Sequence, residues 1–98
     1  MADTQAERNQ ELEQDTLEYL RRTYPFANEI TLLPKNGSQV PVFRDFEDWV
    51  GLVMAELATR QDEVDAAPDQ ATWDAVEIDF AALDAADPGL VLRDFVRL

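Results

Sequence analysis

The stretch DFEDWVGLVMAEL, residues 45–57, carries the clearest structural signal in the sequence. Its apolar residues recur at the spacing of one face of an α-helix: Phe46, Trp49, Val50, Val53 and Leu57. Asp45 suits the N-cap position of such a helix. We therefore predict a long helix from Asp45 to Gln61 or one turn further. Leu52 and Met54 widen its apolar face, which we expect to form the centre of the core.

A second helical pattern precedes this stretch. Leu12, Thr16 and Tyr19 share one helix face from about Gln10 onward. Pro25 ends the pattern because proline disfavours helical geometry in the preceding residue and cannot donate a backbone hydrogen bond. Residues 1–8 are polar, and we expect them to be frayed.

Two other regions have the features of β-structure. Residues 30–33 and 40–43 are β-prone, and Asn36-Gly37 between them favours a hairpin turn. Residues 76–80 alternate apolar and acidic side chains, which is typical of a strand with one buried face. The sequence therefore predicts a β-hairpin and a further strand.

The remaining segments complete the predicted fold. Residues 81–86 indicate a short helical turn, and residues 90–98 fit a helix, which we prefer, or a strand. We predict one α+β domain over residues 9–98, in the order helix, β-hairpin, long helix, strand, helix. A small antiparallel sheet would pack on the helices.

The composition excludes several classes of protein. The 98 residues include 21 Asp and Glu against 8 Lys and Arg, for a net charge of −13, and contain no Cys and no His. Disulfides, thiolate or imidazole metal sites and His-dependent catalysis are therefore excluded. Direct binding to a nucleic-acid backbone or an anionic membrane is disfavoured. The N-terminus lacks a signal-peptide pattern, and no apolar run reaches membrane-spanning length, so we expect a cytoplasmic protein.

No enzymatic, metal or cofactor site is predicted. The carboxylates have no Ca²⁺-loop spacing, and the three glycines are isolated, so no glycine-rich phosphate loop is present. The only serine, Ser38, lies in the predicted turn and has no histidine to activate it. We expect a protein that is not an enzyme and that needs no cofactor.

The charge is concentrated in residues 62–87, which we call the acidic segment. It holds nine acids and no Lys or Arg. The acids could form a solvated face, an adaptation to high salt, or a docking surface for a basic partner. For the docking surface we select the acids of the segment together with its tryptophan as anchor: Asp62, Glu63, Asp65, Asp69, Trp73, Asp74, Glu77, Asp79, Asp84 and Asp87.

The leading functional hypothesis is a small acidic binding protein that occupies a basic surface of a partner protein. One form of it is nucleic-acid mimicry against a phage-defence or DNA-processing enzyme, provided that folding brings the acids onto one face. In size and charge alone, the chain is similar to anti-CRISPR and anti-restriction inhibitors. The alternative is an accessory subunit or assembly factor that docks through apolar residues of 90–98. A homodimer could also form, through the basic residues Arg21, Arg22, Lys35 and Arg44.

Overall fold

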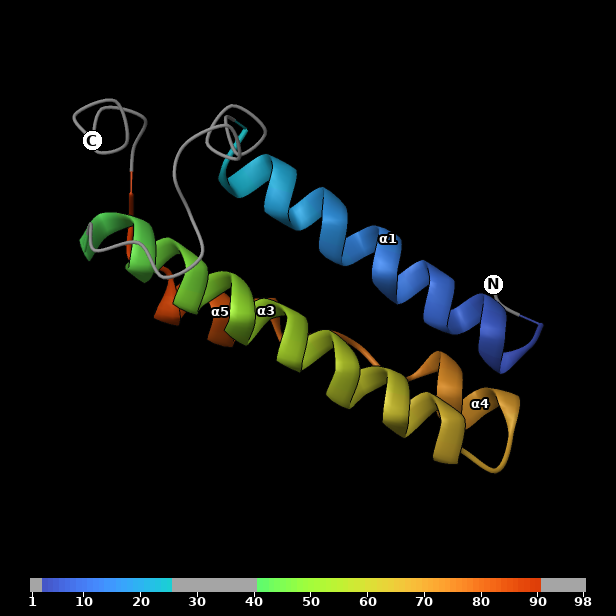
Figure 1. Ribbon diagram of the computed structural model, residues 1–98. Helices are drawn as coiled ribbons and strands as arrows, with labels where there is room; N and C mark the ends of the chain where they lie inside the picture. The colour runs from blue at the N-terminus through green and yellow to red at the C-terminus, as the bar shows by residue number, and fades with distance from the viewer. Residues whose placement is uncertain (1–2, 26–40, 91–98) are drawn as a thin grey trace.

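The computed structural model describes residues 3–25 and 41–90. Within these ranges the chain forms helices and contains no β-strand (Figure 1). The helices are α1 (Gln5–Thr23), α3 (Pro41–Ala66), α4 (Gln70–Asp74) and α5 (Phe80–Ala86). The predicted α+β fold with an antiparallel sheet is therefore wrong for the described part of the chain, which is helical.

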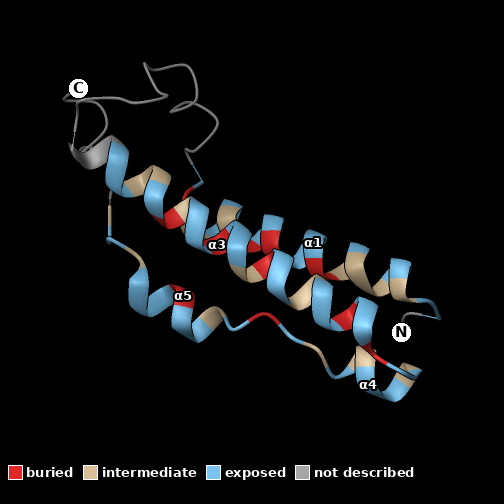
Figure 2. Ribbon diagram, turned by 60° about the horizontal axis from the view of Figure 1, so that its bottom comes forward, coloured by how far each residue is buried: buried red, intermediate tan, exposed pale blue. Residues whose placement is uncertain are grey.

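Helices α1 and α3 lie side by side and run antiparallel, forming a helical hairpin (Figure 1). Residues 67–90, which we call the return segment, then run back along this hairpin (Figure 2). Within the return segment, α4 contacts both α1 and α3, and α5 contacts α3. The return segment thus supplies the third layer of packing.

Helix α1 begins earlier than predicted. The Thr4 side chain is its N-cap and accepts a hydrogen bond from the backbone N–H of Glu7 at 3.1 Å. Thr4 and Glu7 have the spacing of a capping box, a local signal for a helix start. Residues 5–8, which we expected to be frayed, therefore form the first turns. The helix ends at Thr23, ahead of Pro25 as predicted.

Helix α3 also begins early, and its start overturns part of the predicted β-hairpin. Pro41, Val42 and Phe43 are its first residues rather than part of a strand. Proline suits the first helical turn because the N–H that it lacks would have no partner inside the helix. Asp45 consequently lies within the helix and is not its N-cap. The first predicted strand and the turn, residues 30–39, lie outside the described residues. Helix α3 ends at Ala66.

The predicted face of α3 forms the centre of the core. Trp49 and Val53 are 2% and 0% exposed, and the Trp49 ring N–H donates to the backbone carbonyl of Leu83 at 3.0 Å. Leu57 is also buried, and Phe46 and Val50 pack against the core. Leu52 and Met54 were expected to widen this face, but they are 53% and 44% exposed.

The predicted strand over residues 76–80 is not a strand. Residues 76–79 are irregular and α5 begins at Phe80. The alternating burial is nevertheless present, because Ile78 is buried while Glu77 and Asp79 are exposed. The alternation arises because this stretch lies on the helical hairpin, and polar groups of α1 and α3 satisfy its backbone. The Arg8 guanidinium donates to the carbonyl of Val76, and the N–H of Asp79 donates to the Glu56 carboxylate at 2.9 Å.

The C-terminal part of the described chain is short. The predicted turn over residues 81–86 is confirmed as α5. Leu90 is not helical and packs against the core, while the rest of the predicted helix or strand over residues 90–98 lies outside the described residues. None of the described helices combines the length and the apolar composition needed to cross a membrane.

Candidate functional site

Two of the acids that we predicted to bind a partner, Asp69 and Asp79, cap the N-termini of helices. The Asp69 carboxylate accepts hydrogen bonds from the hydroxyl and the backbone N–H of Thr72, at 2.6 and 2.8 Å, and caps α4. These two hydrogen bonds lower the pKa of Asp69. The Asp79 carboxylate accepts from the N–H of Ala82 at 3.1 Å and caps α5. Both carboxylates therefore have a structural role.

Two further acids bind tyrosine hydroxyls of α1 and its C-cap. The Tyr19 hydroxyl donates to Asp84 at 2.7 Å, and the Tyr24 hydroxyl donates to Asp87. Burial of the Tyr19 side chain, followed by the hydrogen bond that its hydroxyl donates to Asp84, raises the pKa of Tyr19. Both tyrosine rings also pack around Trp49, with centroid distances of 5.9 and 5.3 Å. These contacts tie the end of the return segment to α1.

Two acids near the end of α3, Glu63 and Asp65, have polar partners as well. Glu63 forms an ion pair with Arg60 at 2.7 Å, and Arg60 also pairs with Glu56 at 2.6 Å. Both contacts raise the pKa of Arg60. The Asp65 carboxylate accepts from the side-chain amide of Asn9 at 2.8 Å. Glu63 and Asp65 are therefore engaged within the molecule.

Trp73, predicted to be the exposed anchor of the docking surface, is half-buried and packs against the core. Its backbone carbonyl accepts from the Arg8 guanidinium at 3.3 Å. The contacts of Trp73 are thus those of a residue that fastens the return segment to α1.

Asp62, Asp74 and Glu77 differ from the other predicted acids. None of the three forms a hydrogen bond or ion pair with another of the described residues, and Asp62 and Glu77 are exposed. They occupy different elements: Asp62 lies on α3, Asp74 ends α4, and Glu77 lies between α4 and α5. We call Asp62, Asp74 and Glu77 the unpaired acids. The structure therefore separates the acidic segment into carboxylates that hold the fold and carboxylates that are free.

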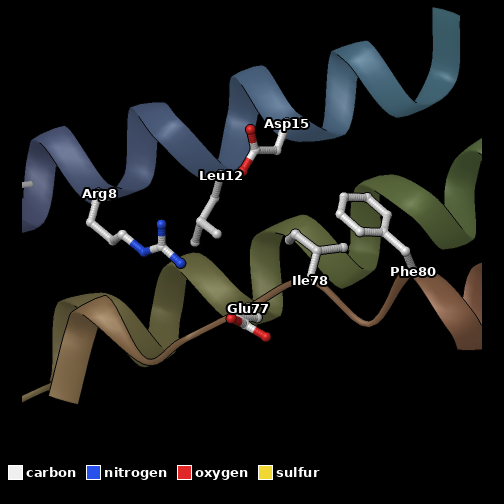
Figure 3. A pocket seen from close by; sticks show the side chains of 6 residues that line it. All are labelled: Arg8, Leu12, Asp15, Glu77, Ile78 and Phe80. Atoms are coloured by element: carbon white, nitrogen blue, oxygen red, sulfur yellow. The ribbon is translucent and has the colours of Figure 1, made fainter. Parts of the chain in front are cut away.

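Glu77 lines a partly open pocket of about 300 Å³ between α1 and the return segment (Figure 3). The pocket has an apolar floor and charged sides, and its lining residues are Arg8, Leu12, Asp15, Glu77, Ile78 and Phe80. In Figure 3, Asp15 on α1 and Glu77 lie on opposite sides of Leu12 and Ile78. Asp15, like Glu77, is exposed and has no polar partner among the described residues.

The positive charge of Arg8 is already engaged. Its guanidinium donates to the carbonyls of Trp73 and Val76 and forms an ion pair with Glu11 at 3.3 Å. Neither pocket carboxylate takes part in these contacts. The pocket therefore keeps two exposed carboxylates over an apolar floor, beside an arginine that is hydrogen-bonded to Trp73, Val76 and Glu11.

The two carboxylates of this pocket are exposed to solvent. A catalytic carboxyl group is typically desolvated, and both Asp15 and Glu77 are exposed. No group of three or more acidic side chains suited to a metal ion is found within residues 3–25 and 41–90. The arrangement offers negative charge and hydrogen-bond acceptors to a cationic group.

A further groove, of about 330 Å³, lies between α3 and α5. Small and apolar side chains dominate its lining: Leu52, Ala55, Glu56, Thr59, Ala82, Leu83 and Ala86. It contains none of the predicted site residues.

Sequence reasoning missed Asp15 and Arg8 as neighbours of Glu77. A local signal existed, because Arg8, Leu12 and Asp15 are spaced to share one face of α1. What the sequence could not supply was the position of residues 76–79 against that face. The alternating pattern of residues 76–80 predicts a strand of a sheet rather than a segment lying on α1.

No protein-family model matches the chain, and neither a curated protein nor a solved structure matches it significantly.

Proposed function

We propose that the protein is a non-enzymatic binding protein that presents free carboxylates to a basic surface of a partner protein. The observation that supports this proposal is the set of unpaired acids. The ion pairs of the described residues use only Glu11, Glu56 and Glu63. Much of the net charge of −13 is therefore not neutralised by ion pairs within the described fold.

Free carboxylates promote association with a basic partner but do not stabilise the fold. Exposed like charges repel one another and destabilise the compact state, whereas they attract and orient a basic partner during its approach. Each exposed ion pair is worth only ~0.2–1 kcal/mol, so a useful interface must combine several of them.

The nucleic-acid-mimicking form of this function requires the free acids to follow a phosphate-like path. Six of the predicted acids already serve caps, tyrosines, Arg60 or Asn9. Mimicry would then depend on the unpaired acids. We retain nucleic-acid mimicry as one specific form of the proposed function, and competition with DNA tests it.

The test compares two variants that remove the same charge. The first neutralises the unpaired acids through Asp62→Asn, Asp74→Asn and Glu77→Gln. The control neutralises Glu13, Glu18 and Asp48, which are exposed and likewise have no polar partner among the described residues. The partner is captured on the wild-type protein at low salt, eluted in a salt gradient and purified. Its association rates with the wild type and both variants are then measured at two ionic strengths.

We expect the first variant to associate at least tenfold more slowly at low salt and the control to lose less than threefold, because steering depends on where the charge lies. A short DNA duplex should compete if the partner surface is a nucleic-acid site. Equal rates for all three proteins, with no dependence on salt, would overturn the proposal and favour the apolar alternative. That alternative rests on residues 90–98, and the apolar groove beside Leu52 adds a described surface to it.

A further inference from the structure

The pocket between α1 and the return segment restricts what can occupy it. Asp15 and Glu77 are exposed, carry negative charge and have no cationic partner among the described residues. An anionic or phosphate-bearing ligand is therefore repelled. An occupant that satisfies both carboxylates must be cationic and must donate hydrogen bonds.

The floor of the pocket requires an apolar portion in the same occupant. Leu12 and Ile78 are buried at 1% and 7% exposure, and half-buried Phe80 lies at one end (Figure 3). A bare Mg²⁺ or Ca²⁺ fits poorly, because these ions take about six or more oxygen ligands. A cation on an aliphatic stem fits both parts of the lining, since such side chains place the stem on apolar surface and the charged group at the edge.

The size of the pocket favours a single side chain. Its volume of about 300 Å³ lies at the lower limit of small-molecule sites, which span roughly 300–1,000 Å³. A side chain projecting from a partner protein needs no more space than this.

From these features we propose that the pocket receives an arginine side chain of the basic partner. This inference rests on the proposed function and identifies one contact within it. A planar guanidinium can donate to carboxylates on two sides at once and can stack on an aromatic ring such as Phe80. A lysine ammonium is a compact charge without that fork. The charge of Arg8 is paired with Glu11, and its guanidinium also donates to two backbone carbonyls, so Asp15 and Glu77 are not its ion-pair partners.

The test is an NMR titration of the full-length protein with N-acetylarginine amide. N-acetylcitrulline amide is the neutral control of nearly the same shape, and N-acetyllysine amide is the charged control. We expect saturable shifts of backbone amides near Leu12, Asp15 and residues 77–80. Arginine should bind at least threefold more tightly than lysine, and citrulline should cause no saturable shift.

Charge-matched variants separate the pocket from general attraction. Asp15→Asn with Glu77→Gln should weaken arginine binding at least fivefold. Glu13→Gln with Asp48→Asn removes the same charge at exposed positions outside the pocket and should weaken arginine binding less than twofold. Spectra of both variants in the absence of ligand establish that the fold is retained.

The outcomes distinguish this inference from the proposed function. Shifts that spread evenly over acidic positions, or equal losses in both variants, would overturn the arginine pocket. If the purified partner still responded to loss of the unpaired acids, the general proposal would stand without the pocket. Equal binding of lysine and arginine would contradict the choice of a guanidinium.

Discussion

The helical hairpin and the return segment are held in place by different kinds of interaction. The hairpin of α1 and α3 buries regularly spaced apolar side chains, with Leu12, Trp49 and Val53 at most 2% exposed. The return segment contains only short helices, and side chains of the hairpin satisfy part of its backbone. Arg8 and Glu56 provide two such contacts. Regularly spaced apolar side chains thus hold the helical hairpin together, whereas specific polar contacts position the return segment and its acids.

Breaking the hairpin should have the largest effect on stability. Val53→Asp would place an unpaired charge at a fully buried position of α3. We expect a loss on the order of 4 kcal/mol or more in the free energy of unfolding, which is a large part of the stability of a small domain. Circular dichroism in a denaturant series measures it. The matched variant Leu52→Asp, at an exposed position of the same helix, should unfold nearly as the wild type does. Similar losses in both variants would show that the face of α3 assigned to the core is incorrect.

Detaching the return segment should have a smaller and more local effect. Arg8→Met keeps much of the side-chain stem but removes the donors to Trp73 and Val76. We expect a loss of about 3 kcal/mol in the free energy of unfolding, the lower end for two hydrogen bonds, because each hydrogen bond to a charged group contributes about 1.5–3 kcal/mol. Hydrogen exchange should accelerate over residues 73–82 and remain slow in α1 and α3. Arg21→Met, which removes the same charge at an exposed position, is the control. Uniform acceleration in both helices and the return segment would contradict separate attachment.

Weakening one tyrosine contact should have a still smaller effect. Tyr19→Phe removes the hydrogen bond to the Asp84 carboxylate but keeps the ring. It should cost about 1.5 kcal/mol at neutral pH, the lower end for a hydrogen bond to a charged group, because Asp84 is exposed.

Tyr19 should also make the free energy of unfolding depend on pH. The folded protein raises the pKa of Tyr19, so the unfolded chain, with a tyrosine pKa of about 10, ionises first. The contribution of Tyr19 to stability is therefore complete below pH ~10 and is lost as the pH rises from there towards the folded pKa. Denaturation curves from pH 8 to 11 should show a steeper decline for the wild type than for Tyr19→Phe. Parallel declines would show that Tyr19 is not the responsible group.

Gly51→Ala should change stability least. Gly51 is exposed within α3, and a Cβ atom there would meet nothing within 4 Å. Close packing therefore does not explain this glycine, and alanine should stabilise the helix by up to ~1 kcal/mol. Thermal melting measures the change. A lower melting temperature would indicate that the hairpin has a packing requirement at this position that the structure does not show.

The sequence predicted the two helices α1 and α3 better than it predicted the return segment, and the reason is physical. Positions 46 to 57 repeat with a helical period, and one helix face explains their burial without knowledge of its neighbour. At residues 76–80 the alternating pattern reports which side chains are buried, but not whether the backbone pairs with a strand. The donor to Val76 is Arg8, 68 residues earlier in the chain, and no local pattern identifies such a contact.

The candidate site shows the same limit. The sequence located the concentration of acids in residues 62–87, but acids look alike in a sequence whether they cap helices, bind tyrosines or remain free. The cap at Asp69, three residues before Thr72, follows a local rule that could have been applied. The contacts of Asp84 and Asp87 with Tyr19 and Tyr24 depend on the tertiary fold.

The acidic segment contains two kinds of carboxylate, those that hold the fold and those that are free. Thermal unfolding of two charge-matched triple variants tests this division most directly. Asp69→Ala, Asp79→Ala and Asp84→Ala remove two helix caps and one tyrosine partner. Asp62→Ala, Asp74→Ala and Glu77→Ala remove only the unpaired acids. We predict a clear fall in melting temperature for the first variant, and an unchanged or higher value for the second because repulsion is relieved. Equal shifts of the same sign in both variants would mean that the acids act only through total charge, and would contradict the division.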